Sequence, residues 1–113
     1  MSNAASIETA LEHLRRGAVI AMPTETVYGL AGDALNPLAI RQIYALKGRP
    51  AGHPVIVHLA PDADPSRWGT ISPAAQSMID AFWPGPLTLI VPRHSRVPDE
   101  VTGGRSTVGI RMP

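Results

Sequence analysis

Two cations flank a glycine in the segment Lys47-Gly48-Arg49, and they are the side chains best suited to bind an anion. Lysine supplies a compact point charge, whereas an arginine guanidinium can hold two phosphate oxygens at once. Glycine lets a phosphate approach the backbone closely. No Asp or Glu occurs between residues 34 and 61, and Lys47 is the only lysine of the chain. The segment therefore predicts a phosphate site, with a solvated basic turn at the end of a helix as the alternative.

A second polar stretch, Thr24-Glu25-Thr26, directly follows a predicted strand. Ligands of open α/β sheets bind beyond the carboxyl ends of the strands. The two hydroxyls and the carboxylate of this stretch can hydrogen-bond a small polar ligand. The alternative is a polar turn against which Tyr28 packs.

His53 and His58 are five residues apart, close to a predicted strand. Odd spacing on a strand places side chains on opposite faces of the sheet, and no other residue nearby completes a zinc site. We therefore predict no metal site here. The alternative for either histidine is an ordinary hydrogen-bonded position.

Thr107 and Arg111 bracket the last predicted strand, and Arg111 follows the apolar run 108–110. An arginine in such a run is costly to bury unless an anion or a carboxylate pairs with it. An anionic ligand and a structural ion pair, for example with Asp33 or Glu25, explain the arginine equally well.

The segment 83–88, Trp-Pro-Gly-Pro-Leu-Thr, joins a predicted helix to a strand. Two prolines restrict its backbone, so we interpret it as a rigid corner with Trp83 packed beneath it. A stacking platform for a base is the alternative. The sequence contains neither G-x-x-x-x-G-K-[ST] nor G-x-G-x-x-G, so ATP binding would require another phosphate cradle.

Helical and extended segments alternate along the chain that must position these residues. Apolar periodicity and capping residues predict helices over 7–16, 37–47 and 73–82, which follow Ser6, Asn36 and Ser72. Gly17 and Gly48 end the first two. Short apolar runs predict strands over 18–22, 55–59, 87–91 and 108–111, with loops over 60–72 and 93–106. The alternation predicts a layered α/β domain.

Composition excludes several classes of protein. The 113 residues are 44% hydrophobic and 17% charged, which is typical of a globular domain. The formal net charge of +1 gives no bulk attraction to nucleic acid or membranes, and no apolar run is long enough to span a bilayer. Without cysteine, disulfides and thiolate metal sites are excluded. We expect a cytoplasmic protein.

The two ends of the chain lead to expectations of their own. We interpret residues 1–4 as an expression scar and residues 5–113 as a single domain. Because the chain stops just after its last predicted strand, we expect this domain to be incomplete at its C-terminus.

Four motifs taken together resemble the YrdC-like family. They are Pro-Thr-Glu-Thr-Val-Tyr-Gly-Leu, Lys-Gly-Arg-Pro, Trp-Pro-Gly-Pro-Leu-Thr and Val-Gly-Ile-Arg-Met-Pro, in this order. The resemblance implies an α/β fold with a twisted mixed sheet, flanking helices and a concave basic cavity. It also implies a nucleotidyl transfer that joins L-threonine, bicarbonate and ATP into threonylcarbamoyl-adenylate and releases pyrophosphate. A separate transferase complex would then modify adenosine 37 of tRNA.

The resemblance also implies roles for individual residues. Lys47 and Arg49 would hold the ATP phosphates and stabilise charge during the reaction, with Mg²⁺ bound mainly by the phosphates. Three residues would bind the threonine substrate: Thr26, His58 and Arg111. Thr107 and His53 would contact the nucleotide, although relatives often carry asparagine where His53 stands. The Ser-x-Asn motif with which the family complements Lys-x-Arg does not occur within these 113 residues.

Two alternatives to this function remain open from the sequence. The first is a non-enzymatic domain that binds tRNA or double-stranded RNA, which the five aromatic residues and the near-zero net charge disfavour. The second is a carbamoyltransferase-type paralogue that keeps the fold but changes the acceptor.

Overall fold

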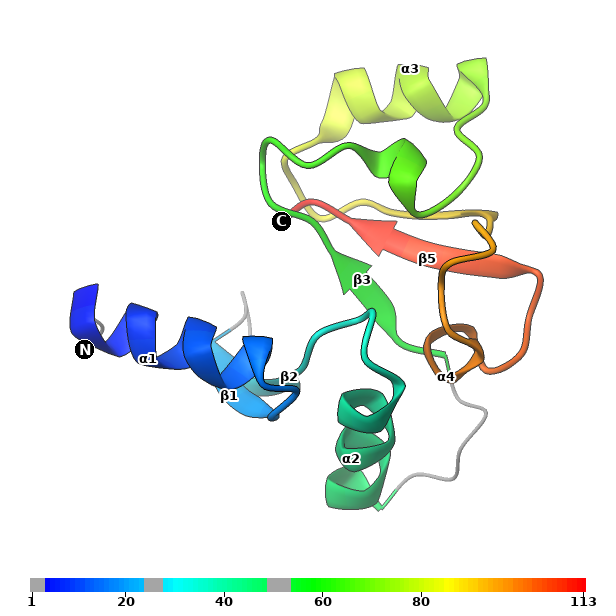
Figure 1. Ribbon diagram of the computed structural model, residues 1–113. Helices are drawn as coiled ribbons and strands as arrows, with labels where there is room; N and C mark the ends of the chain where they lie inside the picture. Colours follow the sequence, from blue (N-terminus) through cyan, green and yellow to red (C-terminus); the bar gives the residue numbers. More distant parts are fainter. Residues whose placement is uncertain (1–3, 24–27, 49–53) are drawn as a thin grey trace. The chain divides into compact units, whose positions relative to one another are not determined.

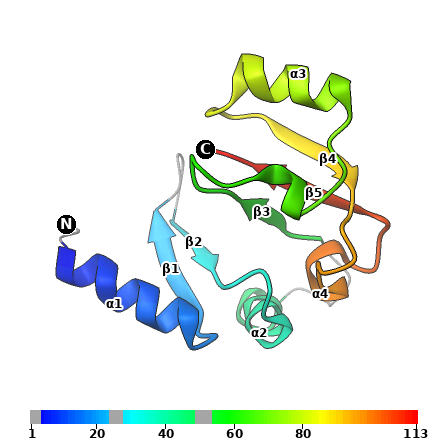
Figure 2. The ribbon, with the colours of Figure 1, turned by 45° about the horizontal axis from the view of Figure 1, so that its top comes forward.

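The computed structural model describes residues 4–23, 28–48 and 54–113, which form two compact units, Met1–Ala51 and Gly52–Pro113 (Figures 1 and 2). Each unit combines helices with a small sheet, which confirms the predicted mixed α/β fold class. No helix in the described ranges is long and apolar enough to cross a membrane.

The first unit holds two helices and an antiparallel strand pair. In chain order these are α1 (Ala4–Arg15), β1 (Ile20–Pro23), β2 (Tyr28–Ala31) and α2 (Pro37–Lys47). Ile20 pairs with Ala31, and Met22 pairs with Gly29. The strand predicted over 18–22 begins two residues before β1, and β2 was not predicted, because its four residues carry no alternating apolar pattern.

The first helix starts three residues earlier than predicted and ends within one residue of the prediction. Because α1 begins at Ala4, Ser6 lies inside the helix and the prediction that it is the N-cap was wrong. Gly17 has a φ of 82°, its N–H donates to the Leu14 carbonyl, and the Ala18 N–H donates to the His13 carbonyl. This pair of bonds is a Schellman motif, whose left-handed position favours glycine.

The second helix, α2, has the caps that the sequence predicts. The Asn36 side chain accepts a hydrogen bond from the Leu38 N–H at 3.0 Å, and Pro37 occupies the first helical position. Gly48 follows Lys47 with a φ of 66° and donates its N–H to the Ala45 carbonyl. Lys47 is therefore the last residue of a helix that is capped at both ends.

The second unit is built on a three-stranded mixed sheet of order β3-β5-β4, in which β5 lies between its neighbours (Figure 2). The strands are β3 (Ile56–His58), β4 (Thr88–Pro92) and β5 (Thr107–Arg111). β3 runs parallel to β5, and β4 runs antiparallel to it. All three confirm predicted strands to within one or two residues at each end.

One face of this sheet carries the core of the second unit. Val57, Val91, Val108 and Ile110 are buried there, one from each outer strand and two from β5. Gly69 packs closely on the same side, since an added Cβ would lie 2.6 Å from Val91 Cγ2. Side chains alternate along a strand, so the neighbours of these residues lie on the opposite face.

The third helix, α3 (Pro73–Phe82), confirms its prediction at both ends. The Ser72 hydroxyl accepts a hydrogen bond from the Ala75 N–H at 3.1 Å, and Pro73 is the first helical residue. The corner that follows is fastened by two hydrogen bonds, from Trp83 Nε1 to the Leu87 carbonyl at 2.8 Å and from the Gly85 N–H to the Met112 carbonyl at 2.9 Å.

Both predicted loops of the second unit contain a short helix. The 3₁₀ helix η1 (Pro65–Arg67) is capped by Asp64, and α4 (Asp99–Thr102) contacts β5. The Val55 N–H donates to the Val101 carbonyl at 2.9 Å, which joins the approach to β3 to α4. Both segments were predicted as loops, but the Asp64 cap forms η1 locally and contacts with β5 support α4.

Candidate functional site

Three polar residues form a row across the sheet of the second unit. His58 on β3 is the register partner of Arg111 on β5, and Thr88 on β4 is the partner of Arg111 on its other side. Partners in register point to the same face of a sheet, with strands about 4.8 Å apart. The structure thus brings together His58 and Arg111, two of the three predicted threonine-binding residues.

This row belongs to the face of the sheet opposite the core, which we call the open face. It is defined by the odd-numbered positions of β5, namely Thr107, Gly109 and Arg111, with their register partners. Ile56 and Ile90 stand on it and keep 48% and 66% of their surface exposed. The open face is therefore an apolar strip with polar groups at one end and a hydroxyl at the other.

Arg111 is half-buried at its end of the open face. Its Nε atom is buried, and its carbonyl accepts a hydrogen bond from the Leu59 N–H at 2.7 Å. The backbone bond fixes β3 against β5 at the level of His58. A half-buried guanidinium in a fixed position is suited to bind a carboxylate in two-point geometry.

Thr107, the predicted nucleotide contact, lies on the same face as Arg111, four residues away on β5. At about 3.3 Å per residue, this separation is roughly 13 Å along the strand. The predicted nucleotide contact and the predicted threonine contact of the second unit therefore lie at separate points along one strand.

Lys47 is exposed at the end of α2, in the first unit. A cation at the C-terminal end of a helix also interacts favourably with the helix dipole, which is the alternative interpretation as a solvated basic turn. Thr26, Arg49 and His53 lie outside the described residues, so their predicted roles and the shared basic cavity stay predictions. The proximity of Lys47 to the open face, which lies in the other unit, likewise stays a prediction.

Trp83 supports its structural interpretation, because its indole N–H donates to a carbonyl within its own corner. The corner leads directly into Thr88, a residue to which the sequence analysis gave no role. Alternation along β4 from Val91 would have placed Thr88 on the side opposite the core, but only the register with Arg111 reveals it as part of the row.

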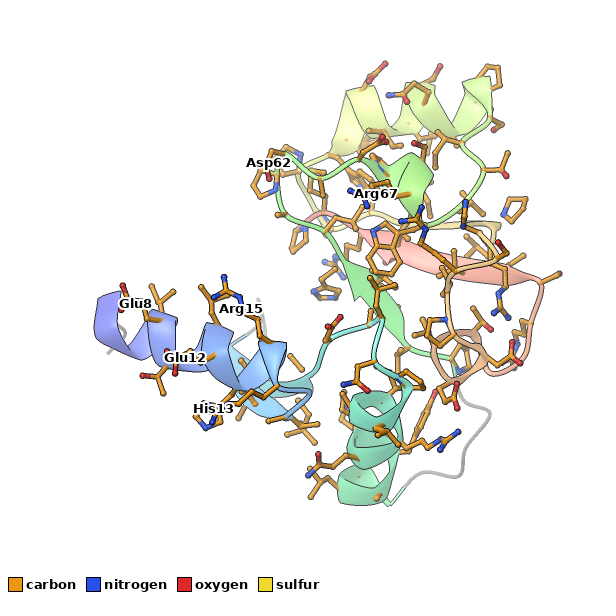
Figure 3. All side chains as sticks on the ribbon, in the orientation of Figure 1. Glu8, Glu12, His13, Arg15, Asp62 and Arg67 are labelled. Carbon is orange, nitrogen blue, oxygen red and sulfur yellow. The ribbon has the colours of Figure 1, made fainter. Side chains whose placement is uncertain are left out.

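The charged side chains labelled in Figure 3 provide a contrast with this row. Glu8, Glu12, His13 and Arg15 all project from α1 and are exposed. The described ranges contain no group of three His, Asp or Glu residues that could hold a metal ion. The open face is thus the best candidate for a site in the part of the chain that the structure describes.

Comparisons with known proteins agree with this choice of family. Residues 12–113 match the family described as Sua5_yciO_yrdC, telomere recombination. The chain is 44% identical to the threonylcarbamoyl-AMP synthase of Pyrococcus abyssi over 108 residues, covering 95% of this chain and 32% of that protein. It is 43% identical to the threonylcarbamoyl-AMP synthase of Bacillus subtilis over 114 residues, covering 99% and 33%.

Solved structures give the same result for the fold. The crystal structure of P. abyssi Sua5 complexed with L-threonine matches with a TM-score of 0.91 and 41% identity, over all of this chain and 34% of that one. E. coli YciO matches with a TM-score of 0.83 and 25% identity, over all of this chain and 55% of that one. The chain spans about a third of the length of the synthases that it matches. It belongs to the Sua5–YciO–YrdC family.

Proposed function

We propose that this chain is the substrate-binding part of a threonylcarbamoyl-AMP synthase. The observation that carries the proposal is the pairing of His58 with Arg111 on the open face. Support comes from the names of the relatives and from the L-threonine complex of P. abyssi Sua5, a protein whose fold this chain shares. Neither relative is named as an RNA-binding domain or a carbamoyltransferase, so these alternatives are not favoured.

The amino-acid end of the proposed site is the polar row. Arg111 would bind the threonine carboxylate, because a guanidinium matches the two oxygens of that group. His58, its neighbour in register, would lie beside the same ligand. Thr26 is proposed as a third contact of the threonine.

The nucleotide end of the proposed site is cationic. Lys47 and Arg49 would hold the triphosphate and stabilise the charge that develops on its oxygens. Thr107 and His53 are proposed as further nucleotide contacts. Mg²⁺ would enter bound to the phosphate oxygens, and we assign it no protein ligand.

The chemistry balances without a protein nucleophile. The amine of L-threonine combines with bicarbonate to give a carbamate and water. A carbamate oxygen then attacks the α-phosphorus of ATP and forms the P–O bond of threonylcarbamoyl-AMP, while the bond to pyrophosphate breaks. The protein's contribution is to hold both reactants in line and to neutralise charge.

The product is a reactive mixed anhydride, so we further propose a transferase complex that consumes it to modify tRNA. We place the reaction in the cytoplasm, where ATP and tRNA are available. Direct binding of tRNA by this chain remains an alternative use of its cations.

The test is threonine-dependent release of pyrophosphate from ATP by the full-length protein, with bicarbonate present. Serine in place of threonine controls for specificity. Lys47→Ala and Arg49→Ala should each abolish release, whereas Arg16→Ala, which removes an exposed cation just after α1, should leave it intact. Near-normal turnover in both Lys47 and Arg49 variants would reject the phosphate role. Salt-dependent tRNA binding without pyrophosphate release would favour the RNA-binding alternative.

A further inference from the structure

A glycine occupies the middle of the open face. Gly109 is the central residue of β5, which is itself the central strand of the sheet. Its register partners are Ile56 on one side and Ile90 on the other. Thr107 and Arg111 lie two residues before and after it on the same face, each about 6.6 Å away along the strand.

The fold itself does not require glycine at this position. The positive-φ glycines of the described residues are Gly17, Gly48, Gly103 and Gly104, and Gly109 is not among them. A Cβ at Gly109 would lie 3.3 Å from Ile90 Cδ1 and 3.7 Å from both Ile56 Cγ1 and Thr88 Cγ2. The shortest of these contacts is to the far end of an exposed, flexible side chain, which can move by the few tenths of an ångström needed.

Glycine in the interior of a strand weakens it, because the residue loses more backbone freedom on folding and has no side chain to pack. A central strand is where this loss should matter most, since both neighbours depend on it. A residue that weakens its own strand, and that packing does not require, is expected at a functional site. A strand glycine often marks a bulge, a tight bend or the close approach of a ligand or another backbone, and the regular register on both sides of Gly109 excludes a bulge.

We propose that Gly109 is a positioning residue that keeps open the junction between the amino-acid and nucleotide subsites. This inference rests on the proposed function, which puts the threonine carboxylate at Arg111 and the nucleotide at Thr107. The bond that forms, between the carbamate oxygen and the α-phosphorus, lies between these two groups in the product. Gly109 lies between the two residues on the strand, so the reacting atoms pass over it.

This role predicts a specific pattern of kinetic effects. A side chain at residue 109 would stand between two ligands that are each held elsewhere, so each should still bind alone. It would, however, prevent the two from meeting in line, and a displacement of about 1 Å costs on the order of 100-fold in rate. The loss should therefore appear in kcat and not in the affinity for threonine.

The experiment compares Gly109→Ala and Gly109→Val with the full-length wild type. Pyrophosphate release gives kcat, calorimetry gives the affinity for L-threonine alone, and thermal unfolding gives Tm. We expect Gly109→Val to lose about 100-fold or more in kcat. Its affinity for threonine should stay within about threefold of wild type. Its Tm should be equal or higher, because valine favours strands. The kcat of Gly109→Ala should lie between those of wild type and Gly109→Val.

Ala74→Val serves as the matched control, since it adds a branched side chain to an exposed residue of α3. It should leave kcat unchanged. Equal kcat in wild type and Gly109→Val would overturn the role of Gly109 while leaving the proposed function standing. Parallel loss of kcat and threonine affinity, or a lowered Tm, would also overturn it. A wild type that releases no pyrophosphate with threonine would reject the proposed function itself.

Discussion

Arg93 reaches Thr102 across the loop that leads to the last strand: its Nη1 donates to the Thr102 hydroxyl at 3.0 Å. The same guanidinium donates to the Val97 carbonyl, to Asp99 Oδ1 at 2.6 Å and to the Arg105 carbonyl at 3.3 Å. Thr102 is almost completely buried, with 1% of its surface exposed. One side chain thus organises the segment that delivers the chain to β5.

Replacing Arg93 with Met should destabilise the protein by roughly 2–4 kcal/mol, because it leaves partly buried acceptors without their charged donor. Asp99→Asn should cost no more than about 1 kcal/mol, since the Asp99 side chain is 78% exposed and solvent screens its charge. Urea denaturation measures both free energies of unfolding. Equal losses in the two variants would show that the ion pair, rather than the whole set of bonds, holds the loop.

Arg111→Met should weaken binding of L-threonine at least tenfold, because a hydrogen bond to a charged group contributes about 1.5–3 kcal/mol. Arg111→Lys should recover only part of the affinity, since an ammonium cannot bind a carboxylate in two-point geometry. Calorimetry on the full-length protein measures both. Arg96→Met, which removes an exposed arginine from the loop after β4, is the control and should bind normally. Unaltered affinity in Arg111→Met would remove this residue from the site.

Gly17→Ala should destabilise the protein more than Gly48→Ala. Both glycines have positive φ, which costs an alanine about 1 kcal/mol. A Cβ at Gly48 meets nothing within 4 Å, whereas at Gly17 it collides with the Asn36 side chain. Displacing Asn36 also removes the N-cap of α2, which costs about 1 kcal/mol more.

A double-mutant cycle isolates this coupling. In an Asn36→Ala background, where the cap is already lost and the clash relieved, Gly17→Ala should cost only about as much as Gly48→Ala. Denaturant unfolding gives the four free energies. Additive costs for Gly17→Ala and Asn36→Ala would contradict the clash.

Ser66→Ala should raise the pKa of Asp64 toward its ordinary value of 3.8. The Ser66 hydroxyl and backbone N–H donate to Asp64 Oδ1 at 2.7 and 3.0 Å and lower the pKa of that carboxyl, with a smaller contribution from Arg67. A folded-state pKa below the unfolded value stabilises the folded protein above pH 3.8, and this contribution disappears as pH falls through the lowered value.

The carboxyl carbon shift of Asp64, followed by NMR against pH, measures the change directly. Arg67→Gln should raise the same pKa less than Ser66→Ala does. The Tm difference between wild type and Ser66→Ala should close as the solution becomes more acidic. A difference that widens at low pH would have the wrong sign for this hydrogen bond.

Local signals predicted some elements nearly to the residue. Helix α2 follows from the Asn36 cap, Pro37 and Gly48, and α3 follows from Ser72 and Pro73, because each of these residues acts through its own backbone neighbours. Helix α4 was missed because its four residues are held by Arg93 and by β5, contacts that local sequence does not encode.

The candidate site was only partly predictable for a related reason. His58 and Arg111 are far apart in sequence, and their alignment depends on the parallel register of β3 and β5. From the sequence, only the resemblance to the YrdC-like family linked His58 with Arg111, because it implies that both bind the threonine substrate. Alternation along β4 could have placed Thr88 on the face opposite the core, but not beside Arg111, because that position is set by the register with β5.

Among the described strands of the second unit, the central strand β5 follows both of its neighbours in the chain. In the part of the chain that the structure describes, β3 and β4 do not pair with one another, and both pair with β5. During synthesis, the β5 partners of residues 56–58 and 88–92 therefore become available only when residues 107–111 emerge. Until then, the backbone groups of both segments that bond to β5 lack that partner, and a chaperone or a neighbouring chain can bind them instead.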